Sequence, residues 1–221
     1  MKKHHAIALG ALLLTSLPLS AATLVKYDFE VDTTAVGESA AGVVTSPLVV
    51  PGDFVRTANN PEAGLGSLAI LFSNLNPGEP PASGTAAPDN VSFTVSAAGG
   101  QFLQLQSLTF LTGMSGNQPT GAVYSVQYNI GAGYVNIGSN FTHTPDLPET
   151  RTIDLSDPIF SNVSSISFRI NITEPVSSTN SGNTSARIDD ISLNGSVIPE
   201  PSSLVLLAAA GFLVAGRRSR R

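Results

Sequence analysis

Short segments in which apolar and polar residues alternate recur along most of the chain. Val25, Tyr27 and Phe29 alternate with charged residues near the start, and every second residue from Ile166 to Ile172 is apolar. A period of two residues is typical of half-buried β-strands. The segments with this pattern, or with a short apolar run of strand length, are residues 24–31, 68–72, 91–95, 102–111, 124–130, 135–137, 153–155, 166–172 and 188–193.

Turn-forming residues separate these segments, and no stretch between residues 23 and 196 keeps an apolar period of 3.6 residues. Eight or more short strands with Gly, Pro and Asn between them predict an all-β fold, an antiparallel β-sandwich of jelly-roll type. Within residues 102–111 the apolar positions change from odd to even numbers near Ser107, which predicts a β-bulge or two short strands.

The first 22 residues differ from the rest of the chain. Lys2 and Lys3 precede an apolar run at residues 6–17, and small residues follow at Ser20–Ala22. This order predicts a secretory signal peptide that signal peptidase cuts after Ala22. A retained N-terminal membrane helix is the alternative, but the apolar run is shorter than such a helix needs. We therefore expect the chain to pass through the export machinery.

Three features follow one another in residues 197–221. Pro199, Glu200 and Pro201 favour an extended segment, because proline cannot continue a helix and restricts the residue before it. An apolar run at residues 204–216 and a basic tail at residues 217–221 come next. Thirteen helical residues span about 20 Å, less than the ~30 Å hydrocarbon core of a bilayer. We expect a single, marginal membrane-spanning helix with its arginines on the cytoplasmic side.

This triplet, apolar run and basic tail together resemble the PEP-CTERM sorting signal. The resemblance implies processing by exosortase, a membrane enzyme similar to transpeptidases, with the family's motif on Pro199, Glu200 and Pro201. It also implies an exported protein of a Gram-negative bacterium. Such a protein is anchored transiently in the inner membrane and then released to the cell surface or the extracellular matrix. An ordinary C-terminal anchor behind a Pro-rich spacer is the alternative.

The sequence thus divides into a signal peptide (1–22), a β-sandwich domain (23–196) and a sorting signal (197–221). Residues 23–198 contain five basic and fifteen acidic residues, so this part carries a net charge of about −10 while the whole chain carries −5. Nucleic acid is not an expected partner, because its phosphates require clustered Lys and Arg. The chain has no cysteine, which excludes disulfides and thiolate metal sites.

Catalytic chemistry has little support in the sequence. His143 is the only histidine after the signal peptide, and its polar neighbours predict a surface loop. The chain has no serine-hydrolase, zinc-protease or nucleotide-binding motif. We therefore predict no catalytic residue and no enzyme activity. A glycosidase needs only two carboxyl groups, so polysaccharide degradation stays open as an alternative.

The last predicted strand carries an acidic pair. Asp189 shares the strand phase of Ile191, and Asp190 that of Ile188. An inward carboxylate needs a cation or hydrogen-bond donors, and calcium prefers six to eight oxygen ligands. One hypothesis is a calcium site, to which Asp28 and Glu30 of the first strand can add oxygens to those of Asp189 and Asp190. The alternative is a solvated acidic pair, or one that Arg187 neutralises.

The phrase Arg-Ile-Asp-Asp-Ile-Ser-Leu-Asn-Gly at residues 187–195, with residues 166–170 before it, resembles jelly rolls of the carbohydrate-binding-module type. The resemblance implies a calcium where the first and last strands meet, and a sugar groove lined with aromatic residues. There is no tryptophan, and Tyr124 and Tyr128 share a buried phase. Tyr134 is therefore the candidate for stacking on a sugar, and a role as an edge residue of the core is its alternative.

These observations favour a structural or adhesive role with exopolysaccharide. The alternative is a carbohydrate-binding or polysaccharide-degrading module that the same signal delivers.

Overall fold

A computed structural model describes residues 21–29, 35–50, 55–57, 69–72, 89–115, 121–144, 147–173 and 185–200. Within these ranges the chain forms twelve β-strands and one short 3-10 helix. Their bounds are β1 Ala22–Tyr27, β2 Glu38–Ser39, β3 Val43–Thr45, β4 Val55–Thr57, β5 Ala69–Phe72, β6 Asp89–Ala97, β7 Gln101–Ser115, β8 Ala122–Asn129, β9 Val135–His143, β10 Glu149–Asp154, η1 Pro158–Phe160, β11 Ser165–Thr173 and β12 Ser185–Pro199.

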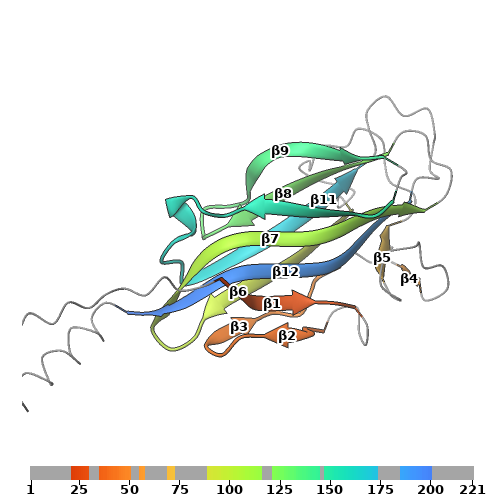
Figure 1. Cartoon of the computed structure of the whole chain (residues 1–221). Helices are drawn as coiled ribbons and strands as arrows, with labels where there is room; N and C mark the ends of the chain where they lie inside the picture. The colour runs from red at the N-terminus through yellow and green to blue at the C-terminus, as the bar shows by residue number, and fades with distance from the viewer. Residues whose placement is uncertain are drawn as a thin grey trace, which may run out of the picture.

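The strands form two antiparallel sheets. The first sheet has the order β10-β7-β12-β1-β2, and β5 joins it by pairing with both β12 and β4. The second has the order β3-β6-β11-β8-β9. Strand β12 lies between β7 and β1 (Figure 1), so the last strand of the body is also a central one. The predicted antiparallel β-sandwich is confirmed, and the described ranges contain no α-helix.

The core lies between the sheets and is built from alternating residues of both. Val25, Tyr27 and Phe29 are fully buried, as their alternation predicted. The ring of Tyr27, from the first sheet, lies 5.2 Å from that of Phe93, and Phe93 lies 5.5 Å from Phe168; both phenylalanines belong to the second sheet. Aromatic contacts of this kind add to the free energy of burial and hold the two layers in register.

The phase change near Ser107 is a β-bulge within one continuous strand. On β12, Asn194 pairs with Ser107, but the next residue, Gly195, pairs with Leu105. Gln106 is therefore an extra residue in β7, which turns the buried side from odd to even positions. The bulge was one of the two structures that the sequence predicted.

Candidate functional site

A second bulge, in β12, shapes the junction of the first and last strands. Asp189 pairs with Leu111 of β7, and the next paired residue, Ser192, faces Thr109, so β12 carries one residue more than β7 here. Asp190 has a positive φ of 48°, and its backbone N–H donates a 2.8 Å hydrogen bond to Oδ1 of Asp189. The left-handed backbone directs the Asp190 side chain toward β1, since the bulge interrupts the alternation of side chains.

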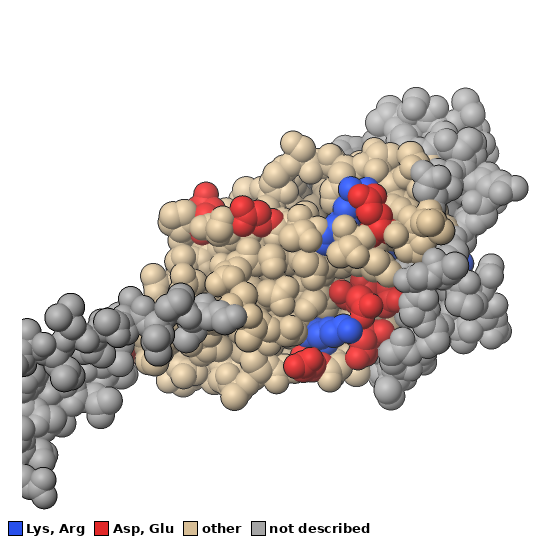
Figure 2. Space-filling model, in the orientation of Figure 1, with Lys and Arg blue, Asp and Glu red and all other residues tan. Residues whose placement is uncertain are grey.

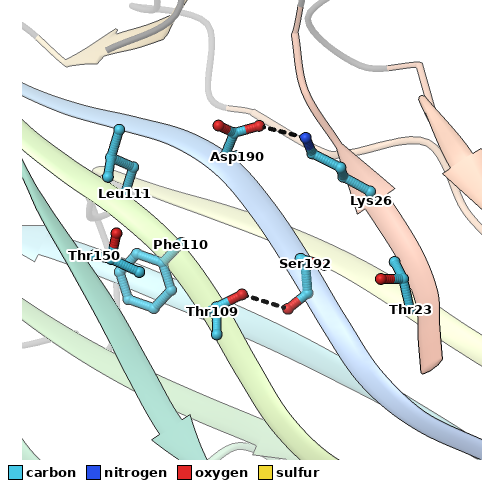
Figure 3. Close-up of a pocket in the computed structure, with 8 residues that line it drawn as sticks. All are labelled: Thr23, Lys26, Thr109, Phe110, Leu111, Thr150, Asp190 and Ser192. Atoms are coloured by element: carbon cyan, nitrogen blue, oxygen red, sulfur yellow. Dashed lines mark hydrogen bonds and ion pairs between the residues drawn. The ribbon is translucent and has the colours of Figure 1, made fainter. Parts of the chain in front are cut away.

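Lys26 of β1 meets this side chain. Its Nζ lies 2.8 Å from Oδ1 of Asp190, and Figure 3 shows the two groups facing each other across the strands. The hydrogen bond with Asp190 raises the pKa of Lys26, and the negative charges of Asp190, Asp28 and Asp189 add to this while partial burial opposes it. The ammonium group of Lys26 is therefore the cation that pairs with Asp190 at this junction.

Three of the four expected calcium ligands lie in the described part of the first and last strands and the residues that follow β1. Asp190 contacts Lys26, and the charges of Asp28 and Asp189 also raise the pKa of this lysine, whereas Glu30 lies outside the described residues. No three acidic or histidine side chains in the described ranges are arranged to hold a metal ion. Asp189 is only 1% exposed and Arg187 only 3%, because residues 186–189 of β12 are covered on both faces. Calcium binding stays a prediction.

A hollow of about 400 Å³ lies beside this ion pair on the first sheet. Four strands contribute to it, and Figure 3 shows how its side chains converge from β1, β12, β7 and β10. Its lining consists of Thr23, Lys26, Thr109, Phe110, Leu111, Thr150, Asp190 and Ser192. Hydroxyl groups and one ion pair dominate this set. No sequence motif pointed to it, because its residues come from strands that only the sheet order makes neighbours.

The candidate for sugar stacking, Tyr134, lies on the other sheet. Its side chain is partly exposed, and the guanidinium group of Arg169 lies over its ring, 4.0 Å from the centroid. Arg169 donates two hydrogen bonds, of 3.0 and 2.7 Å, to Oε1 of Gln127. Gln127 in turn donates a 2.8 Å bond to Oδ1 of Asn136. Tyr134 is thus held in place by a cation–π contact, and sugar stacking on it stays a prediction.

His143 is not in a surface loop, and that prediction was wrong. It ends strand β9, only 2% exposed, with Nδ1 3.1 Å from Oγ1 of Thr112. The hydroxyl of Thr112 donates a hydrogen bond to the carbonyl oxygen of Glu149 at 3.1 Å. The hydroxyl oxygen therefore accepts the hydrogen bond that Nδ1–H of His143 donates. The signal in the sequence was the shared phase of Ile137, Phe141 and His143, which marks one face of a strand.

Charged side chains are few on the surface of the sandwich. Figure 2 shows small groups of acidic and basic side chains on a face that is otherwise uncharged. Besides Lys26 and Asp190, Arg151 and Glu149 form an ion pair, and the Arg151 guanidinium lies 4.7 Å from the ring centroid of Phe141. Two acid–base pairs thus lie among the described residues, and Figure 2 also shows acidic groups with no base beside them.

The C-terminal motif begins inside the sandwich. Pro199 is the last residue of β12 and pairs with Gln101, the first residue of β7. The carboxylate of Glu200 lies against Gly100 in the turn between β6 and β7; a β-carbon on Gly100 would come within 3.1 Å of Oε1. Pro201, the expected apolar helix (204–216), the basic tail and most of the signal peptide lie outside the described residues. Within the described residues, no helix has the length and apolar character to cross a membrane.

Comparison with known proteins identifies the C-terminal segment. Residues 197–221 match the family model of the PEP-CTERM protein-sorting motif. No curated protein matches the chain. The motif implies export, sorting toward the membrane and cell surface, and processing by exosortase.

Several solved structures resemble the body. The CBM22-1 xylan-binding domain of Paenibacillus barcinonensis Xyn10C is 10% identical, with a TM-score of 0.46 over 80% of this chain and 96% of that domain. The K3 adhesin domain of Lys-gingipain from Porphyromonas gingivalis is 11% identical, with a TM-score of 0.41 over 79% and 100%. A module specific for non-crystalline cellulose is 11% identical, with a TM-score of 0.42 over 67% and 88%. The body is a two-sheet sandwich that resembles carbohydrate-binding modules in fold.

Proposed function

We propose that this chain is a non-enzymatic protein of a Gram-negative envelope, sorted by its C-terminal signal to the cell surface or the extracellular matrix. There it has a structural or adhesive role with exopolysaccharide. The observation that carries the proposal is the match of residues 197–221 to the PEP-CTERM motif, which begins within the last strand of a folded body, β12. Because the signal and the sandwich belong to one chain, the sandwich is sorted to the same destination as the signal.

The burial and the positions of the histidine and carboxyl side chains support a non-enzymatic role. A general base must reach its substrate, but His143 is buried and bonded to Thr112. Glycosidases place two carboxyl groups on opposite sides of the scissile bond. Asp190 instead forms an ion pair with Lys26, and Asp189 is buried.

The outer face of the second sheet supports a role with neutral polysaccharide. Hydroxyl side chains pair across its strands: Thr94 with Ser167 at 2.7 Å, and Ser96 with Ser165 at 2.8 Å. Such groups both donate and accept hydrogen bonds, as sugar hydroxyls do, and they attract no counterions.

Replacing Pro199-Glu200-Pro201 by three alanines tests the sorting step. The signal peptide and the apolar run are unchanged in this variant, so we expect normal export and retention in the inner membrane. The wild-type protein should leave the membrane with an intact mass that lacks residues 204–221. A released wild-type species that still contains these residues would mean an ordinary anchor, and the proposal would be wrong.

A carbohydrate-binding or polysaccharide-degrading module is the second candidate. The hollow between β1, β12, β7 and β10 favours it, because threonine and serine hydroxyls beside an ion pair can bond to sugar hydroxyls. Glycan-array binding by the exported protein, lost when Thr150 and Thr109 are changed to valine, would support this candidate. A protein that binds no glycan on its own but co-fractionates with the matrix would support the structural role.

A further inference from the structure

The sorting motif is part of the folded body, not of a free linker behind it. From Ser185 to Pro199, strand β12 pairs with β7 along its length, and the pairing ends at Pro199 with Gln101. Glu200, which follows, is partly buried. Two of the three motif residues are therefore positioned by the sandwich before any enzyme binds them.

The side chain of Glu200 lies against the turn between β6 and β7. Ala98 and Gln101 close this turn with a 3.2 Å backbone hydrogen bond, and Gly99 and Gly100 between them have positive φ values of 53° and 73°. This is the geometry of a two-residue hairpin turn that favours glycine at both central positions. Gly100 also allows close approach, because a β-carbon there would meet Oε1 of Glu200 at 3.1 Å and its Cδ at 3.4 Å. Gly99 has open space at the same place.

One edge of β12 has no described strand beside it near the motif. The pairing with β1 begins at Ala22 opposite Gly195, whereas β7 continues on the other side to Pro199. In the part of the chain that the structure describes, the segment Ser196–Pro199 is thus paired on one side only. An unpaired strand edge is a surface to which another protein can add an extended segment.

Only a short stretch of chain separates the end of β12 from the expected membrane-spanning run. The expected apolar run begins at Leu204, and even a fully extended chain from Pro199 to Leu204 spans at most about 18 Å. An enzyme that binds Pro199-Glu200-Pro201 and its neighbours must therefore either contact the sandwich or pull the end of β12 away from β7.

We propose that the processing enzyme docks on this end of the folded sandwich. The docking surface on the sandwich consists of the β12 edge at Ser196–Pro199 and the β6–β7 turn at Ala98–Gln101, against which Glu200 lies. This inference rests on the proposed sorting function and deepens it: the partner is the membrane enzyme that recognises residues 197–221, and the body supplies part of the recognition. Gly100 is a positioning residue for Glu200.

A matched pair of variants tests the contact between Gly100 and Glu200. Gly100→Ala and Gly99→Ala impose the same left-handed strain on the turn, but only the first places a methyl group against Glu200. In pulse-chase experiments on the full chain in its host, we expect Gly100→Ala to slow tail removal by roughly 2- to 10-fold, the factor that corresponds to one lost hydrogen-bond-sized contact. Gly99→Ala should be processed at the wild-type rate. Melting temperatures of the two variants check that they fold alike.

An insertion gives a second, independent test. Six residues, Gly-Ser repeated three times, between Ser196 and Val197 leave the whole matched signal intact but detach it from β7 and the turn. We expect slower tail removal in this variant too. Equal or faster removal in both Gly100→Ala and the insertion variant would overturn the inference and mean that the enzyme recognises a linear peptide. A wild-type chain that keeps its tail would instead overturn the proposed function itself.

Discussion

Nζ of Lys26 lies 2.8 Å from Oδ1 of Asp190, so an ion pair joins the first strand of the sandwich to the last. The two side chains are 36% and 48% exposed, and water screens their attraction. The contact nevertheless links two strands that are far apart in the sequence, at the junction where calcium was expected.

Breaking this ion pair should lower the free energy of unfolding only slightly at neutral pH, and by less at high pH. In a double-mutant cycle of Lys26→Met and Asp190→Asn, we expect a coupling free energy of about 0.2–1 kcal/mol at pH 7. Asparagine tolerates the left-handed backbone of Asp190, so the cycle isolates the charge. The raised pKa of Lys26 means that the stabilisation is complete below the ordinary lysine pKa and disappears as pH rises through the folded-state value. Urea denaturation from pH 7 to pH 11.5 measures both; a coupling that does not fall as pH rises above the ordinary lysine pKa would contradict the charge-based explanation.

Calcium should compete with the lysine at the same carboxylates. We expect millimolar calcium to raise the melting temperature and EDTA to lower it, since a ligand that binds only the folded state stabilises that state. The rise should be larger in Lys26→Met, where Asp28, Asp189 and Asp190 have lost the ammonium among them. Thermal melts of wild type and variant with calcium, magnesium and EDTA provide the measurement. Curves that do not respond to calcium in either protein would exclude the metal.

Tyr27 should make the fold sensitive to alkaline pH. Its hydroxyl donates to the carbonyl oxygen of Ser46 at 2.7 Å and lies 2.7 Å from Oγ1 of Thr45. Burial raises the pKa of this phenol, because the charged form loses its hydration, while the bond to Thr45 acts in the opposite direction. Stability is therefore lost as pH rises past about 10, the ordinary tyrosine value.

Replacement of Tyr27 by phenylalanine separates the hydroxyl from the ring. We expect Tyr27→Phe to lose about 1 kcal/mol at pH 7. The difference from wild type should shrink as pH rises from 9 to 11, since the variant has no phenol to ionise there. Tyr134→Phe, in the turn before β9, is the control for the loss of an exposed tyrosine hydroxyl. A constant difference between Tyr27→Phe and wild type across this range would contradict the role of ionisation.

The hydroxyl of Thr112 should matter for stability. It bridges His143 and the carbonyl oxygen of Glu149, and the side chains of Thr112 and His143 are both buried. Thr112→Val keeps the shape but removes both bonds, so we expect a loss of about 1–3 kcal/mol in the free energy of unfolding. Thr152→Val on neighbouring β10, where the side chain is exposed, should change it by less than about 0.5 kcal/mol.

The exported protein should show no hydrolytic turnover. Incubation with a panel of polysaccharides, followed by assay of reducing ends, should give no signal above a heat-denatured sample. His143→Gln should behave as wild type in the same assay. Release of reducing sugar that survives this substitution would point to a pair of carboxyl groups as the catalyst and would support the degrading module.

Much of the fold and of the sorting signal could be predicted from the sequence, because both are local patterns. The alternation at Val25, Tyr27 and Phe29 set the inner face of the first strand, and burial of these residues confirms it. The change of phase at Ser107 located a bulge. Pro199-Glu200-Pro201 with its apolar run and basic tail identified the sorting motif, since its parts are contiguous in the chain.

Only the tertiary structure decided which distant residues meet. Strand order and bulges set these contacts, and a shift of one residue moves a side chain to the other face of a sheet. The extra residue in β12 thus brings Asp190 to Lys26, and the pairing of Pro199 with Gln101 places Glu200 on Gly100. His143 is buried for the same reason: β8 pairs with β9 up to Ala122 opposite His143, which carries a histidine from a polar stretch of sequence into the core beside Thr112.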